Sequence, residues 1–252
     1  LFLLQNNQGR YDLKLVKYPF DNPHGLAWGP DGLLYIGEKE KIVRYRYLNG
    51  QLTNPQVVVG NILKEKGYMH PLTQFTFDPN TGDLFVNIGS ASDHCRVDGK
   101  KDYKYCAENA ERGTGAIVRI PAAEIKNLGP GGVRAFEATA LGLRNSMAIA
   151  IHEPSGTVVQ GENSRDFPEF DEPYEEMNVI LKNKLGSYYT LHYGWPYCYD
   201  YRATSPEWLF PENANAPLKQ QFTKPIYCNA GENPSGGSSG YMPPHSLIPP
   251  HA

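Results

Sequence analysis

Oxygen-bearing side chains gather at the end of one segment that alternates like a β-strand. The group consists of Glu162, Asn163, Asp171, Glu172, Glu175 and Glu176. Carboxylate and amide oxygens are the ligands that a hard cation such as Ca²⁺ prefers in proteins. A solvated acidic loop has the same composition, and composition alone favours this simpler interpretation.

Two predicted strands position this group. Apolar side chains alternate along residues 145–152 and 157–161, and residues 153–156 between them read Glu-Pro-Ser-Gly. An alternating pattern interrupted by such a turn predicts a β-hairpin. Because Glu162 follows the second strand directly, we expect the polar residues at the rim of a sheet, where strand scaffolds often carry their sites.

The same hairpin pattern occurs three times in the sequence. Its copies span residues 23–38, 71–89 and 145–162, and each contains a turn with proline. Further β-rich segments lie between the copies, at residues 41–47 and 115–120. Repeated sheet units with a period of about 50 residues, lengthened by loop insertions, indicate a β-propeller.

The composition fits one turn-rich, all-β domain over residues 1–252. The chain has 25 Gly, 21 Pro and 40% hydrophobic residues, and only residues 122–126 look helical. A net charge of −3 without a basic stripe gives no indication of nucleic-acid binding. No apolar run is long enough to span a membrane, and residues 1–4 are too few for a signal peptide. Residues 250–251 repeat the Pro-His that opens the first copy, so we expect a propeller that is incomplete at the C-terminus.

Four cysteines form two local groups, Cys95 with Cys106 and Cys198 with Cys228. The local pairing would close two short loops, and each such bridge stabilises by about 3–4 kcal/mol in the loop-entropy model. A zinc site is the alternative, since His94 adjoins Cys95, but the sequence has no C-x-x-C pair. Two disulfides would indicate an oxidising compartment, in the periplasm or outside the cell.

Four motifs follow one another along the chain: GLRN at 142–145, ENSRD at 162–166, EEMN at 175–178 and HYGWP at 192–196. Together they resemble the glucose/sorbosone dehydrogenase family of soluble sugar dehydrogenases, and the sorbosone-dehydrogenase-like branch fits best. The resemblance covers most of the chain. It implies a six-bladed β-propeller, of which this chain supplies only part. It also implies pyrroloquinoline quinone (PQQ) across one face, with Ca²⁺ bound to it.

The resemblance also implies roles for individual residues near the cofactor. His70 matches the catalytic histidine, and Arg144 and Asn145 match the pair that contacts the quinone. A neutral imidazole can remove a hydroxyl proton as hydride leaves the substrate carbon. A guanidinium can stabilise the negative charge that develops on the acceptor oxygen.

For the metal, the resemblance points to main-chain oxygens. The carbonyls of Ser164 and Arg165 match the Ca²⁺ ligands, with Glu162 and Asn163 beside them. The cationic residues that hold the PQQ carboxylates are expected in later blades.

The sequence departs from the family pattern near the expected base. Met69 stands where a carboxylate or a second histidine is expected, so nothing obvious in the sequence orients His70. Ser90 stands where sugar-specific members carry Asp, which weakens any inference of glucose preference.

The resemblance predicts a PQQ- and Ca²⁺-dependent dehydrogenase that oxidises a sugar, either an aldose or a sorbosone-like substrate, or a related alcohol or aldehyde. Electrons would pass to an acceptor such as a cytochrome or a quinone. Two alternatives stay open. A non-catalytic propeller that binds a partner would explain the departure at Met69. A Ca²⁺-dependent hydrolase of the lactonase type would use Glu162 and Asn163 around one metal.

Overall fold

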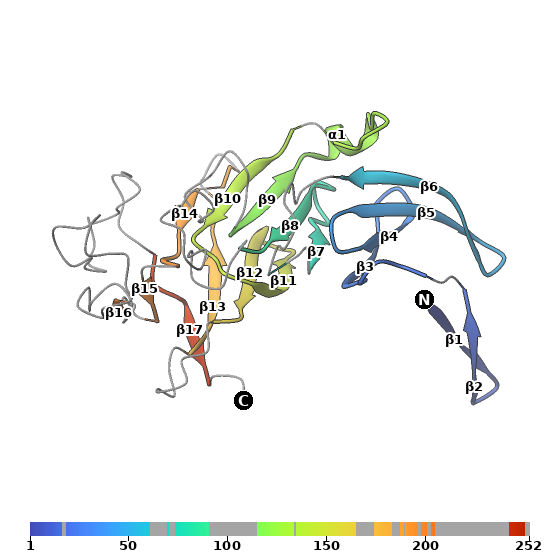
Figure 1. The fold of residues 1–252 in the computed structure, drawn as a ribbon, viewed down its shortest axis with the longest axis horizontal. Coiled ribbons are helices and arrows are strands. Elements are labelled where there is room, and N and C mark those ends of the chain that lie inside the picture. The colour runs from blue at the N-terminus through green and yellow to red at the C-terminus, as the bar shows by residue number, and fades with distance from the viewer. Residues whose placement is uncertain are drawn as a thin grey trace, which may run out of the picture.

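The structure, a computed structural model, is built almost wholly from β-strands, with one short helix among the described residues (Figure 1). It describes residues 1–16, 19–60, 70, 74–90, 115–133, 135–164, 174–182, 187–188, 190–195, 198–200, 203–204 and 242–249. Three sheets follow one another along the chain, and a separate hairpin precedes them (Figure 1).

Each sheet is built on four antiparallel strands. The first sheet contains β3 (Gly25–Trp28), β4 (Leu34–Gly37), β5 (Ile42–Leu48) and β6 (Gln51–Val59). The second contains β7 (Phe75–Phe77), β8 (Leu84–Ile88), β9 (Ala116–Ile120) and β10 (Glu137–Leu141), and β14 (Leu191–His192) joins β10 in parallel. The third contains β11 (Ser146–His152), β12 (Thr157–Glu162), β13 (Glu175–Ile180) and β17 (Ser246–Ile248).

The remaining elements are small. The N-terminal hairpin consists of β1 (Phe2–Asn7) and β2 (Arg10–Leu15), and a two-stranded sheet consists of β15 (Cys198–Tyr199) and β16 (Ala203–Thr204). Helix α1 (Ala122–Lys126) follows β9. It begins after Pro121, and a carboxylate oxygen of Asp83 accepts a hydrogen bond from its first N–H at 2.9 Å. This contact satisfies one of the amides that a helix start leaves unpaired.

The three predicted hairpins are confirmed as β3–β4, β7–β8 and β11–β12. The predicted outer strands and the short helix are also found, as β5, β9 and α1. All three hairpin turns contain a glycine with positive φ, at Gly32 (73°), Gly82 (74°) and Gly156 (64°). Residues with a side chain rarely adopt this conformation, so the local sequence specifies these turns strongly.

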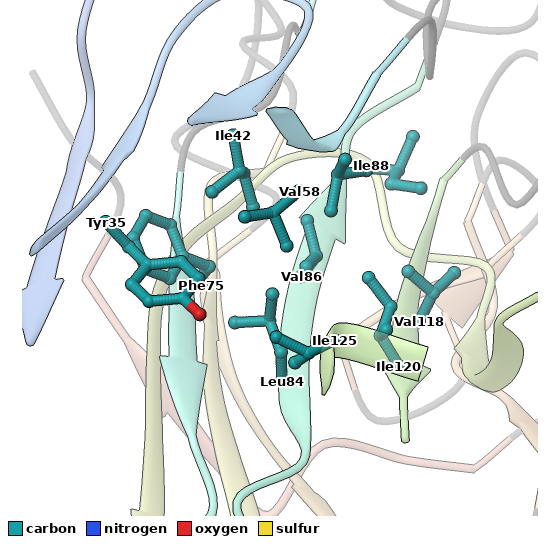
Figure 2. Packing of buried hydrophobic residues seen from close by; sticks show 11 residues of the cluster. Tyr35, Ile42, Val58, Phe75, Leu84, Val86, Ile88, Val118, Ile120 and Ile125 are labelled. Carbon is teal, nitrogen blue, oxygen red and sulfur yellow. The ribbon is translucent and has the colours of Figure 1, made fainter. Parts of the chain in front are cut away.

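Strand β8 shows how the sheets pack, because both of its faces are buried. Leu84, Val86 and Ile88 lie in a first hydrophobic cluster with Tyr35 and other residues of the first sheet (Figure 2). The side chain between them, Phe85, lies in a second cluster with residues of the third sheet. Successive side chains of a strand point to opposite faces, so β8 packs against a neighbouring sheet on each side. This is the arrangement of adjacent propeller blades.

Polar contacts also connect the sheets. Lys182, just after β13, forms a 2.9 Å ion pair with the buried carboxylate of Asp78 in the β7–β8 turn. In the first sheet, Arg44 pairs with Asp31 at 2.8 Å and donates a hydrogen bond to the carbonyl of Ile125 in α1. Each contact joins segments that are separated in the sequence.

The β1–β2 hairpin was not expected from the sequence. It extends away from the three sheets (Figure 1). Its register places Phe2 opposite Leu15 and Leu4 opposite Leu13, and all four side chains are more than half exposed.

Several predictions concern residues outside the described part of the chain and stay predictions. These residues are Met69, Cys95, Cys106, Arg165, Asp171, Glu172, Cys228 and residues 250–251. Cys198 is disulfide-bonded, while its pairing with Cys228 stays a prediction, as does the assignment of residues 1–252 to one domain. Within the described ranges, no helix has the length and apolar character that crossing a membrane requires.

Candidate active site

Three chain segments meet where the second and third sheets adjoin. Residues 89–90 follow β8, residues 142–145 connect β10 to β11, and residues 163–164 follow β12. The amide of Ser90 donates to the carbonyl of Arg144 at 2.7 Å, and the amide of Asn163 donates to the carbonyl of Asn145 at 2.9 Å. These main-chain bonds bring Arg144, Asn145 and Asn163, which were predicted to belong to one site, next to one another.

His70 lies at this junction and is buried. Its Nδ1 is 2.8 Å from the hydroxyl and 3.1 Å from the carbonyl oxygen of Ser90. The main-chain N–H of His70 also donates to that carbonyl, at 3.3 Å. The expectation that nothing orients His70 was therefore wrong. The residue that contacts the ring is not a sequence neighbour such as Met69 but lies twenty positions away.

Arg144 is the cationic group of the site, and it is 8% exposed. One terminal nitrogen of its guanidinium donates to the carbonyls of Asn163, at 2.7 Å, and Ser164, at 3.0 Å. The same nitrogen lies 3.2 Å from the side-chain oxygen of Asn163. Arg144 thus contacts the predicted metal-ligand segment directly.

Glu162 holds the chain segment that carries Arg144. Its Oε1 accepts the main-chain N–H of both Arg144 and Asn145, the latter at 2.7 Å. Its Oε2 accepts Gln160 Nε2 at 2.6 Å and lies 3.4 Å from the hydroxyl of Ser146. A carboxylate offers about four acceptor positions, so these four contacts occupy the group. Burial raises the pKa of Glu162 to about 7, although the two main-chain N–H donors favour the charged form.

A second buried carboxylate lies opposite the first. Glu176 on β13 pairs in register with Glu162 on β12. It accepts the main-chain N–H of Asp200 at 2.8 Å, and Asn178 Nδ2 lies 3.3 Å from its other oxygen. Burial raises the pKa of Glu176 to about 8, and the negative charge of Glu162 adds to this shift. For these two residues the interpretation as a solvated acidic loop was wrong, because both side chains are buried in the third sheet.

Residues 192–195, the described part of the HYGWP motif, contact residues 141–142, which directly precede Leu143 and Arg144. The ring of His192 occupies the space beside Gly142, whose φ is +67°, so that a Cβ there would collide with the imidazole. The amides of Tyr193 and Trp195 donate to the carbonyls of Leu141, at 2.8 Å, and Gly142, at 3.0 Å. Burial lowers the pKa of His192 to about 4, so this imidazole stays neutral at neutral pH. Its position indicates a packing role.

Residues 8–252 match the model of the TrAA12-like family. This match extends over nearly the whole chain. The chain belongs to the TrAA12-like family. No curated protein matches it.

Solved structures agree with the fold of this TrAA12-like chain. The calcium structure of the Trichoderma reesei family AA12 carbohydrate-active enzyme is 20% identical, with a TM-score of 0.68, and the match covers 99% of this chain and 62% of that one. The holo form of the pyranose dehydrogenase PQQ domain from Coprinopsis cinerea is 17% identical, with a TM-score of 0.66, over 99% and 60% of the two chains. A putative oxidoreductase (glucose dehydrogenase) from Thermus thermophilus is 23% identical, with a TM-score of 0.52, over 79% and 59%.

These matches, with the stacked sheets, confirm the predicted all-β propeller fold. The structures that share this fold include a PQQ domain and a putative glucose dehydrogenase, the class of protein that the sequence resembles. The TrAA12-like chain spans about 62% of the length of the Trichoderma reesei structure, in agreement with a partial propeller.

The TrAA12-like site offers oxygens that suit a hard cation. The side-chain oxygen of Asn145 is buried and has no hydrogen-bond partner within the described structure. The carbonyls of Asn163 and Ser164 each accept a bond from Arg144, and a carbonyl oxygen has a second lone pair. Neutral carbonyl and amide oxygens are ligands that Ca²⁺ accepts. Among the described residues, no group of three or more His, Cys, Asp or Glu is arranged to hold a metal.

Proposed function

We propose that the chain forms part of a PQQ- and Ca²⁺-dependent dehydrogenase that oxidises a sugar, or a related alcohol or aldehyde, by hydride transfer. The TrAA12-like family match supports this, as do the similar structures of a PQQ domain and of a calcium-containing AA12 enzyme. The observation on which the proposal rests is that Ser90 hydrogen-bonds to both His70 and Arg144. Ser90 thereby connects the residue that would supply the base to the main chain of the residue that would supply the cation, at a buried junction of two sheets.

His70 would act as the general base. An imidazole can accept a proton at neutral pH, and the hydroxyl of the substrate must lose one as its carbon is oxidised. Because the ring is buried and bonded to Ser90, its direction is set before the substrate arrives. A general base contributes a factor of about 10² to 10⁴ to the rate.

Arg144 would stabilise the negative charge that develops during the oxidation. Its guanidinium is held by the carbonyls of Asn163 and Ser164, so it needs no reorganisation as the charge appears. When bound, PQQ supplies the hydride acceptor and Ca²⁺ supplies Lewis acidity. Asn145 and the carbonyls of Asn163 and Ser164 would hold the cation, and Glu162 would keep Arg144 and Asn145 in place.

We further propose that the protein works in the periplasm or outside the cell. The disulfide at Cys198 supports this, because stable disulfides form in oxidising compartments. A two-electron oxidation also requires a partner that removes the electrons, and a cytochrome or a quinone would serve as this acceptor.

The test is reconstitution of the full-length protein with PQQ and Ca²⁺, followed by dye-linked oxidation of aldoses, sorbosone and simple alcohols. We expect dye reduction that needs both PQQ and Ca²⁺. A protein that binds no PQQ at any Ca²⁺ concentration would overturn the proposal in favour of a binding module. Lactone hydrolysis that needs Ca²⁺ but not PQQ would overturn it in favour of a hydrolase.

A further inference from the structure

Ser90 bonds to two predicted site residues: its hydroxyl and carbonyl oxygens contact the ring of His70, and its amide donates to the carbonyl of Arg144. It follows β8 and Gly89, and it is fully buried. The approach to His70 is close: a Cβ on Gly89 would lie 2.5 Å from the carbonyl oxygen of His70 and 2.6 Å from its Cβ. The absence of a side chain at position 89 therefore lets His70 reach Ser90.

The two oxygens of Ser90 decide which nitrogen of His70 carries the proton. A carbonyl oxygen can only accept hydrogen bonds, and the carbonyl of Ser90 lies 3.1 Å from Nδ1. With the proton on Nδ1 this contact is a hydrogen bond, whereas in the other tautomer the carbonyl would face the lone pair of Nδ1. The hydroxyl, at 2.8 Å, lies at the same nitrogen and can accept from it as well. The lone pair of the neutral imidazole is then on Nε2.

The other side of Ser90 bonds to the cationic part of the site. Its amide donates to the carbonyl of Arg144 at 2.7 Å, and the amide of Arg144 donates to Glu162. The position of Ser90 is thus tied through main-chain bonds to the residue that carries the guanidinium. Both oxygens of Ser90 are neutral, so they orient the imidazole without placing a negative charge beside it.

We propose that Ser90 is the positioning residue of this site, which selects the Nδ1–H tautomer of His70 and so presents Nε2 as the base. This inference rests on the proposed role of His70. It adds to that role a residue that acts through His70.

The test is NMR spectroscopy of the cofactor-free protein with ¹⁵N-labelled histidine, because the ring nitrogen shifts distinguish the two tautomers. His70→Gln assigns the signals by their loss. In the wild type we expect the Nδ1–H tautomer at His70. In Ser90→Ala we expect the ring signals to move toward the average of both tautomers. In the reconstituted enzyme, the same variant should lower turnover by about 10- to 100-fold, as small misplacements of catalytic groups do, with PQQ affinity unchanged.

The chain offers a matched control in Ser155, whose hydroxyl lies 2.8 Å from Nδ1 of His152 in an exposed turn. Ser155→Ala removes a similar Ser–His contact and should change neither the His70 signals nor turnover. An Nε2–H tautomer at His70 in the wild type would overturn the inference, whether or not Ser90→Ala folds. His70 signals in Ser90→Ala that coincide with those of the wild type would overturn it too. A protein with the expected tautomer that binds no PQQ would contradict the proposed function and not the tautomer assignment.

Discussion

Glu162 and Glu176 lie opposite one another on adjacent strands, and both carboxylates are buried. Each accepts at least one main-chain N–H, so both belong to the framework of the site. Two buried acidic groups in register would repel one another if both were ionised. Burial raises the pKa of each, the charge of Glu162 raises that of Glu176 further, and a dependence of stability on pH follows.

We expect the free energy of unfolding to fall as the pH rises from about 5 to about 8. Because burial raises the pKa of Glu176 to about 8, the folded protein holds a proton there that the unfolded chain has already lost above its ordinary pKa of 4.5. The stabilisation is complete below the unfolded value and is lost as the pH rises through the folded value. Glu176→Gln, which stays neutral, should flatten the profile by an amount on the order of a few kcal/mol.

Chemical denaturation in a chelating buffer, followed at several pH values, measures this effect. Glu153→Gln removes an exposed carboxylate in the β11–β12 turn and should leave the profile as it is in the wild type. A Glu176→Gln profile as steep as that of the wild type would contradict the prediction.

His70→Ala should lower turnover by about 10² to 10⁴ while PQQ remains bound, because it removes the base and leaves the Arg144 segment intact. Steady-state kinetics and cofactor titration measure the two effects separately. His152→Ala, at an exposed position, is the control and should retain the turnover of the wild type. Full activity of PQQ-loaded His70→Ala would rule out this base.

Arg144→Ala should weaken PQQ binding as well as turnover. The substitution removes a buried cation and also the hydrogen bonds that hold the carbonyls of Asn163 and Ser164. Removal of Ca²⁺ with a chelator should resemble this defect more than that of His70→Ala. PQQ affinity is measured by titration, with exposed Arg46→Ala as the control. An unchanged affinity of Arg144→Ala for PQQ would show that Arg144 does not contribute to cofactor binding.

Gly142→Ala should destabilise the fold more than Gly32→Ala. Both glycines have similar positive φ, +67° and +73°, so both substitutions incur about 1–2 kcal/mol of backbone strain. Only at Gly142 would the new Cβ also collide with the ring of His192, whereas no atom lies within 4 Å of a Cβ at Gly32. Thermal unfolding of the two variants compares them directly. Equal losses would show that His192 moves away without cost.

Much of the fold could be predicted from the sequence because its signals are local. Each of the three hairpins combines alternating side chains with a turn that contains a glycine of positive φ, and both features lie within about 20 residues. The helix at Ala122–Lys126 was likewise recognisable from a short segment. The hairpin β1–β2 was missed although apolar and polar residues alternate along β2, because the apolar residues of β1 are consecutive and show no such alternation.

Part of the site was also recognisable. The motif at residues 142–145 and the motif at 162–166 pointed to one rim, and the structure joins Asn145 to Asn163 through a main-chain bond. The motifs did not reveal what Glu162 does. Three of its four hydrogen bonds come from the consecutive residues 144–146, which precede it by sixteen to eighteen positions, and a single sequence contains no record of such partners.

The sequence by itself therefore determined the strands, their turns and the residue types available at the rim. Only the tertiary structure decided that Ser90 orients His70, that Glu176 faces Glu162, and that β17 joins β13 across more than sixty residues. The physical reason is that alternation and turn propensity depend on neighbours along the chain. Hydrogen-bond partners, burial and the resulting pKa shifts depend instead on which sheets pack together, and this is fixed only when the blades assemble.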